Sequence, residues 1–121
     1  MSYKRSVRFV EPWLEEDLKE RPRIVRAGAR VAREELERDG LDPDDRRVER
    51  CQEIGSDGTE LGGCVKFTLP LSGHWRMVLV ALVLRDGDSE AYLCLAVGQA
   101  HPRRGEGPSV YEIADRRLHN R

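Results

Sequence analysis

The stretch WRMVLVALVL, residues 75–84, is almost continuously apolar and rich in valine and leucine. A run of this kind predicts a strand in the middle of a sheet, buried on both of its faces. The Asp86-Gly87-Asp88 triplet that follows is a strong hairpin turn signal. The segment AYLCLAV, residues 91–97, then reads as the returning strand. The sequence therefore predicts an antiparallel hairpin at the centre of the fold.

Two further strands are predicted before this hairpin. Residues 64–69, CVKFTL, form a short strand that Pro70 ends, and Ser72-Gly73 forms the turn into the central strand. Residues 3–10 alternate imperfectly, but their valine and aromatic content favours a strand that adds to the same sheet.

Three helices are predicted from their start and stop signals. Pro12 suits the first turn of a short helix over 11–20, and Pro22 opens a longer helix that Gly40 ends. Ser109 and Glu112 have the spacing of a capping box for a closing helix over 110–119. In the long helix we expect Gly28 to face the sheet. The residues that recur there at three- and four-residue steps are Ile24, Val25, Gly28, Val31, Ala32, Glu35 and Leu36.

The segment 41–62 is polar, with turn signals at 42–45 and 55–58 and room for a short helix or strand near 48–54. The element order is therefore β–α–α–β–β–β–α. It predicts one α+β domain over residues 1–121, with two N-terminal helices packed on one face of a mainly antiparallel sheet and a closing C-terminal helix.

Composition narrows the class of protein. The net charge of −1 argues against a general nucleic-acid-binding protein, although residues 61–121 carry 8 basic and 6 acidic side chains. The three cysteines include no Cys-x-x-Cys motif, and Cys94 reads as a small core residue. With no apolar run near the ~18–20 residues of a membrane span and no apolar stretch behind the first residues, we expect a reduced, cytoplasmic setting.

Three segments contain the candidate catalytic residues. They read GHWR at 73–76, AVGQAHPRR at 96–104 and VYEIADRRL at 110–118. Cleavage of RNA without a metal ion needs a base, a positive charge on the phosphate and an acid for the leaving oxygen. Arg76, His101 and Tyr111 are residue types able to supply these groups.

The same segments resemble the core of the RelE/ParE toxin superfamily. An aromatic-Arg pair on one strand, Gly-x-x-His/Arg after the next strand and a downstream Val-Tyr recur in that family. The resemblance implies the element order given above and no cofactor or metal. It also implies that Arg76 stabilises the phosphate, that His101 moves protons, and that Tyr111 stacks on a base or supports the proton transfer.

The function implied by the resemblance is that of a toxin of a toxin–antitoxin pair. Such a protein cleaves mRNA at the ribosomal A site, and its partners are a cognate antitoxin, the mRNA and the ribosome. Arg103, Arg104 and Lys66 then contact the RNA backbone, and no membrane is involved.

Other interpretations of these residues stay open. Arg76 also suits a strand-end arginine paired with an acid, His101 a solvated loop, and Tyr111 a ring packed on the sheet. A non-enzymatic domain of the same fold, either a ParE-like gyrase inhibitor or an interaction module, is the alternative function. An enzyme requires Arg76, His101 and Tyr111 on one surface. The sequence contains no P-loop, Gly-x-Ser-x-Gly, Rossmann or metal-ligand pattern.

Overall fold

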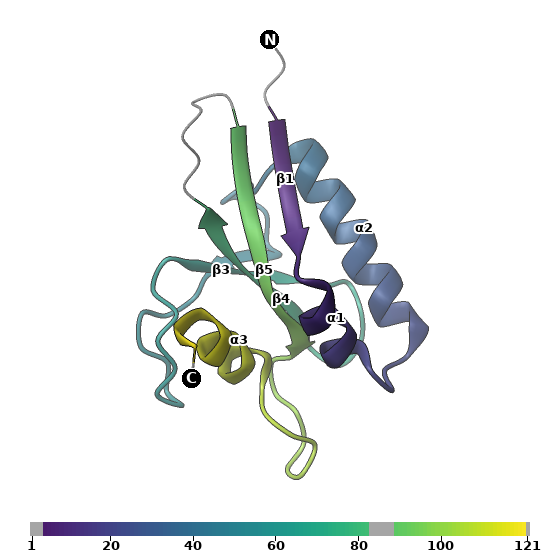
Figure 1. Cartoon of the computed structure of the whole chain (residues 1–121), viewed down its shortest axis with the longest axis vertical. Coiled ribbons are helices and arrows are strands. Elements are labelled where there is room, and N and C mark those ends of the chain that lie inside the picture. The colour runs from purple at the N-terminus through teal and green to yellow at the C-terminus, as the bar shows by residue number, and fades with distance from the viewer. Residues whose placement is uncertain (1–3, 83–88, 121) are drawn as a thin grey trace.

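The computed structural model describes residues 4–82 and 89–120, and Figure 1 shows their arrangement. The expected α+β class is confirmed. In chain order the elements are β1 (Lys4–Phe9), α1 (Glu11–Leu18), α2 (Arg23–Asp39), β2 (Val48–Arg50), β3 (Cys64–Thr68), β4 (Trp75–Leu82), β5 (Ser89–Gln99) and α3 (Val110–His119).

The strands form one sheet in the order β1-β5-β4-β3-β2, with β4 in the centre. Neighbouring strands from β2 to β5 run antiparallel, and β1 joins β5 in parallel. Met77, Val78 and Leu79 in β4 have no exposed surface, as the apolar run predicted. Residues 83–84 of the predicted strand and the turn at 86–88 lie outside the described residues.

The helices cover both faces of the sheet: the two N-terminal helices share one face, as predicted, and α3 lies on the other. Helices α1 and α2 pack on the face that carries Phe67, Met77 and Val97. Helix α3 packs with Val110 and Ala114 on the opposite face. A central strand that is apolar on both sides needs cover on both sides, and α3 supplies the second cover.

A β-bulge interrupts the pairing of β4 with β5. The register passes from Val78↔Ala96 to Leu79↔Cys94, so Leu95 is an extra residue on β5. As a result, Leu95 and Ala96 both pack on the α3 face, while Cys94 packs on the other.

Helix α2 begins and ends where the sequence predicted, but its buried face differs. The buried residues are Val25, Ala29, Ala32 and Leu36, whereas Ile24 and Val31 are about 60% exposed. Gly28 does not face the sheet: a Cβ atom there would lie 3.0 Å from Cδ1 of Leu71, in the connection from β3 to β4. Gly28 therefore approaches the side chain of Leu71, which lies in a loop and not in the sheet.

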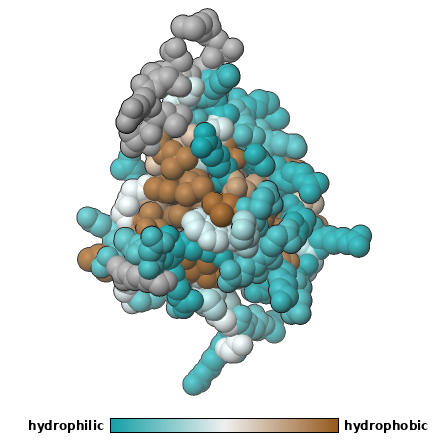
Figure 2. Space-filling view, in the orientation of Figure 1, coloured by the Kyte–Doolittle hydropathy of each residue, from teal (hydrophilic) through white to brown (hydrophobic). Residues whose placement is uncertain are grey.

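The surface agrees with this arrangement. Figure 2 shows apolar side chains gathered over the strands in the middle of the face seen in Figure 1, with hydrophilic side chains around them. No helix within the described residues has both the length and the apolar character needed to cross a bilayer.

Candidate functional site

A cleft of about 330 Å³ lies between the 51–61 loop and the first turn of α3, and we call it the α3 cleft. Three of the predicted site residues line it: Lys66 from β3, His101 from the loop after β5, and Tyr111 from α3. The other lining residues are Cys51, Gln52, Gly55, Ser56, Asp57, Thr59, Leu61, Ala100, Ser109 and Glu112.

Lys66 lies against the ring of Tyr111. Its Nζ atom is 5.4 Å from the centroid of that ring and 3.6 Å from a carboxylate oxygen of Glu49, its cross-strand partner. Only 23% of the Lys66 side chain is exposed. Lys66 therefore lies on the face of the sheet that α3 covers.

Tyr111 is held in place by the start of α3. The hydroxyl of Ser109 accepts a hydrogen bond from the Glu112 backbone N–H at 3.2 Å, and the Ser109 N–H donates to the Glu112 carboxylate at 3.2 Å. This is the capping box that the sequence predicted. Gly98 in β5 supports the same turn, since a Cβ there would lie 3.3 Å from Cβ of Val110.

His101 lies at the mouth of the α3 cleft and is exposed. Its ring is 5.7 Å from the ring of His74, edge to face. His74 has a φ of 57° in the turn before β4, and its carbonyl accepts a 2.8 Å hydrogen bond from the Ala100 N–H. The two turns at this end of the sheet thus support the His101 imidazole, a group able to accept and release a proton.

Arg76 lies on the α3 face of β4, because its neighbours Trp75 and Met77 pack on the other face. Its guanidinium donates to the Trp75 carbonyl at 3.2 Å, and no carboxylate of the described residues is within ion-pair distance of it. Arg76 does not line the α3 cleft. Since Lys66 pairs with Val78, Lys66 and Arg76 are diagonal neighbours, for which Cβ atoms are typically about 7–8 Å apart.

Arg103 and Arg104 lie outside the α3 cleft. Both are exposed in a tight turn where the Glu106 N–H donates to the Arg103 carbonyl at 2.9 Å. Figure 1 shows that the connection from β5 to α3 projects well beyond the helix. The two arginines are therefore presented to solvent.

The acids of the α3 cleft are engaged within the protein. Asp57 accepts hydrogen bonds from the backbone N–H and the hydroxyl of Thr59 at 3.1 and 2.7 Å. Burial opposes ionisation of Asp57, but these hydrogen bonds outweigh it and lower the pKa of the carboxyl. Sequence reasoning missed this wall of the cleft, for which the turn pattern at 55–58 was the available signal.

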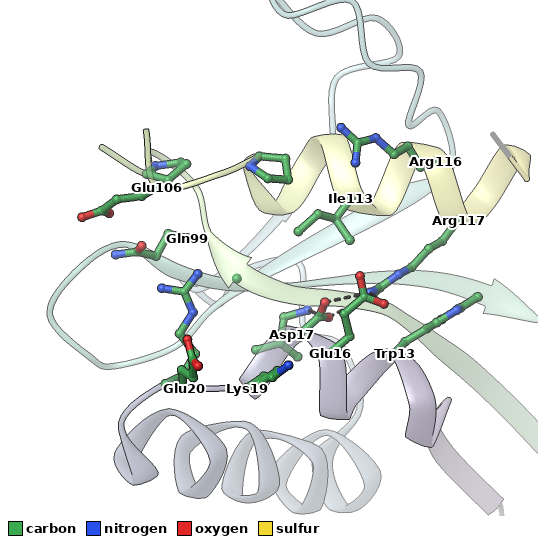
Figure 3. A pocket seen from close by; sticks show the side chains of 15 residues that line it. Trp13, Glu16, Asp17, Lys19, Glu20, Gln99, Glu106, Ile113, Arg116 and Arg117 are labelled. Atoms are coloured by element: carbon green, nitrogen blue, oxygen red, sulfur yellow. Dashed lines mark hydrogen bonds and ion pairs between the residues drawn. The ribbon is translucent and has the colours of Figure 1, made fainter. Parts of the chain in front are cut away.

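A larger cleft of about 710 Å³ lies on the other side of α3, and we call it the α1 cleft (Figure 3). It runs along the end of β5 between α1 and α3, and a hydrogen bond joins Arg117 of α3 to Asp17 of α1 within it. Its charges are mixed. The charged lining residues are Glu16, Asp17, Lys19, Glu20, Arg21, Glu106, Arg116 and Arg117.

The α3 cleft thus joins a cation, an imidazole and a phenol, which can bind an anion and transfer protons to or from it. Over residues 4–82 and 89–120, no three His, Cys, Asp or Glu side chains gather in a group fit to hold a metal ion. Comparisons of the chain with protein-family models, with curated proteins and with solved structures found no match.

Proposed function

We propose that this chain is a RelE/ParE-like toxin, an endoribonuclease that cleaves mRNA on the ribosome and is neutralised by a cognate antitoxin. The element order expected from the sequence agrees with the fold apart from the additional short strand β2, which makes the proposal permissible without assigning the chemistry. The observation that carries it is the meeting of Lys66, His101 and Tyr111 in the α3 cleft from three separate segments.

In the proposed reaction the RNA supplies its own nucleophile. His101 takes the proton of a 2′-hydroxyl, whose oxygen attacks the neighbouring phosphorus. Lys66 and Arg76, neighbours on the α3 face, balance the charge of the phosphorane-like transition state. The bond to the 5′-oxygen breaks, and that oxygen takes a proton from the Tyr111 hydroxyl; the proton held by His101 then returns to Tyr111 through solvent. The products carry a 2′,3′-cyclic phosphate and a 5′-hydroxyl.

Tyr111 has a second use in this scheme. Lys66 covers one face of its ring, and the ring also lines the α3 cleft, where a base can stack beside it. Arg103 and Arg104 are exposed, and their positive charges contact backbone phosphates of the RNA or the ribosome in this scheme.

Inducible expression tests the proposal. Induction should arrest growth, the adjacent open reading frame should relieve the arrest, and mapped mRNA should gain 5′-hydroxyl ends within translated regions. Lys66→Ala should weaken the arrest, whereas Lys19→Ala, which removes a lysine of the α1 cleft, should not. Growth arrest with no new mRNA ends would contradict the nuclease.

The charges of the α3 cleft favour a second candidate, a non-enzymatic binding domain of the gyrase-inhibitor or interaction type. Glu49 engages Lys66, Asp57 and Glu112 line the cleft, and the chain has a net charge of −1. Such a surface repels an RNA backbone more than a protein partner. Arrest accompanied by DNA damage and intact mRNA would support gyrase, and no arrest would support an interaction module.

A further inference from the structure

Cys51 and Cys64 face one another across the end of the β2–β3 ladder. The register of this ladder pairs Arg50 with Val65, so the next position pairs Cys51 with Cys64. A hydrogen bond of 3.0 Å from the Cys51 N–H to the Cys64 carbonyl continues the ladder to this position. Both side chains pack in the cluster on the α3 face.

This placement suits a disulfide bond. Hydrogen-bonded antiparallel partners have Cα atoms about 5.5 Å apart, which is the commonest separation in disulfides, about 5.5–6 Å. Their Cβ atoms, about 4.5–5.5 Å apart in such pairs, must approach to the ~3.5–4.5 Å of a disulfide. Cys51 lies just beyond the last residue of β2, so the chain can turn there without breaking the sheet.

The surroundings of Cys51 and Cys64 differ from those of the third cysteine, Cys94. Cys51 is partly exposed and lines the α3 cleft, so a small oxidant can reach it. Cys64 is buried directly behind it. Cys94 is buried on the opposite face of the sheet. Burial, with a contribution from nearby Cys64, raises the pKa of the Cys51 thiol to about 11, so little of it is thiolate at neutral pH and its attack on a disulfide is slow.

We propose that Cys51 and Cys64 form a reversible intramolecular disulfide when the chain meets a disulfide oxidant of the glutathione class. The Cys51 thiolate attacks oxidised glutathione and releases one glutathione thiolate. The Cys64 thiolate then attacks the Cys51 sulfur of the mixed disulfide and releases the second. Two protein thiols are oxidised, one oxidised glutathione is reduced to two glutathione thiols, and the two protons pass to them.

The bond has a consequence for the α3 cleft. Cys51 and Cys64 flank the segment 52–63, which supplies one wall of the cleft, including Asp57 and Thr59. Joining its two ends restricts that wall. This inference goes beyond the proposed function, because the bond forms whatever the cleft binds.

The full chain provides a direct test. It is incubated with oxidised glutathione, quenched in acid, unfolded, alkylated and digested with trypsin. Both cysteines fall in one peptide, residues 51–66, because Arg50 precedes it and Lys66 ends it. That peptide should lose two hydrogens and take up no alkylating reagent. Hydrogen exchange across 52–63 should slow in the oxidised protein and recover on reduction.

Two variants sharpen the outcome. Cys94→Ala should form the bond like the unaltered chain, and Cys64→Ala should stop at a glutathione adduct on Cys51. The proposal is overturned if the unaltered chain keeps such an adduct, links to a second chain, or uses Cys94. It is also overturned if peptide 51–66 keeps both thiols under conditions that oxidise the urea-unfolded chain.

Discussion

Asp17 and Arg117 form a buried, two-point ion pair that joins α1 to α3 across the edge of β5. Both nitrogen–oxygen distances are 2.8 Å, and the two side chains are 3% and 9% exposed. The same groups bind the strand: Asp17 accepts from the Val97 N–H at 2.9 Å, and Arg117 donates to the Leu95 carbonyl at 2.8 Å. Because β1 pairs only as far as Cys94, the ion pair occupies the place of a neighbouring strand.

Breaking this pair should therefore be costly. We expect Asp17→Asn or Arg117→Met to lower the free energy of unfolding by about 3–5 kcal/mol, because each leaves a buried charge without its partner. Urea unfolding at neutral pH measures this, and the double variant should lose less than the sum of the two. Asp39→Asn, in the exposed pair with Arg38, should change stability by less than about 0.5 kcal/mol.

The close approach of Gly28 to Leu71 predicts that α2 tolerates only a small side chain at position 28. Gly28→Leu should cost about 1–3 kcal/mol by overpacking. Gly28→Ala should be nearly neutral, because a gain of up to about 1 kcal/mol in helix propensity offsets the displacement of Cδ1 of Leu71, 3.0 Å away. Thermal unfolding tests both, and Leu71→Ala should reduce the penalty of Gly28→Leu. An unchanged melting temperature for Gly28→Leu would contradict this packing.

If the α3 cleft cleaves RNA, its rate should respond to Arg76 and His101. Arg76→Ala should slow cleavage about 10²–10³-fold through the loss of one transition-state donor. His101→Gln should slow it about 10²–10⁴-fold through the loss of acid–base catalysis. Both variants should stay folded and bind the antitoxin. Arg30→Ala, on the exposed side of α2, should cleave normally, and undiminished cleavage by the first two would exclude their proposed roles.

The exposed arginines of the 101–108 loop give a prediction about binding. Reversing Arg103 and Arg104 to Glu should weaken ribosome association and flatten its dependence on salt, since fewer phosphate charges are neutralised. Co-sedimentation over a range of salt concentrations measures this. The circular dichroism spectrum should not change, because neither side chain is buried. Unaltered association would remove this loop from the RNA contact.

The ion pairs of Arg47 with Glu35 and Asp45 predict how the stability of the fold changes at acid pH. Hydrogen bonds from the Arg47 guanidinium and then from its backbone N–H lower the pKa of Asp45 to about 2, and Arg47 lowers the pKa of Glu35 as well. A depressed folded-state pKa stabilises the protein above the unfolded value, near 4 for aspartate, and the contribution is lost as pH falls toward 2. Urea unfolding from pH 6 to 2 should show this loss, and Arg47→Met should flatten it relative to Arg46→Met.

Local signals in the sequence predicted most of the elements. The apolar run of β4 and the Ser109–Glu112 capping box each act over a few residues, and both have the predicted form. The short β2 was one of two options, because a strand of three residues carries little periodicity. The side of the sheet on which α3 packs was missed, although a strand apolar on both faces already required two layers of cover.

The candidate site was also only partly predictable, because tertiary packing and not local sequence brings its residues together. Lys66, His101 and Tyr111 come from separate segments, and nothing local to any of them states that they line one cleft. The partnership of Asp17 with Arg117 spans almost the whole chain. Such contacts are products of tertiary packing, so residue type and spacing indicate the candidates without indicating their neighbours.

The parallel pairing of β1 with β5 also sets an order of assembly. The hairpin of β4 and β5 joins consecutive segments, so it can form early at a small entropic cost. We expect the first strand to be synthesised to wait for the last one, because among residues 4–82 and 89–120 it pairs with β5 alone. Helices α1 and α2 remain attached to an undocked β1 during that interval. Folding of this chain should therefore be limited by closure of its N-terminal third onto a core built from the rest.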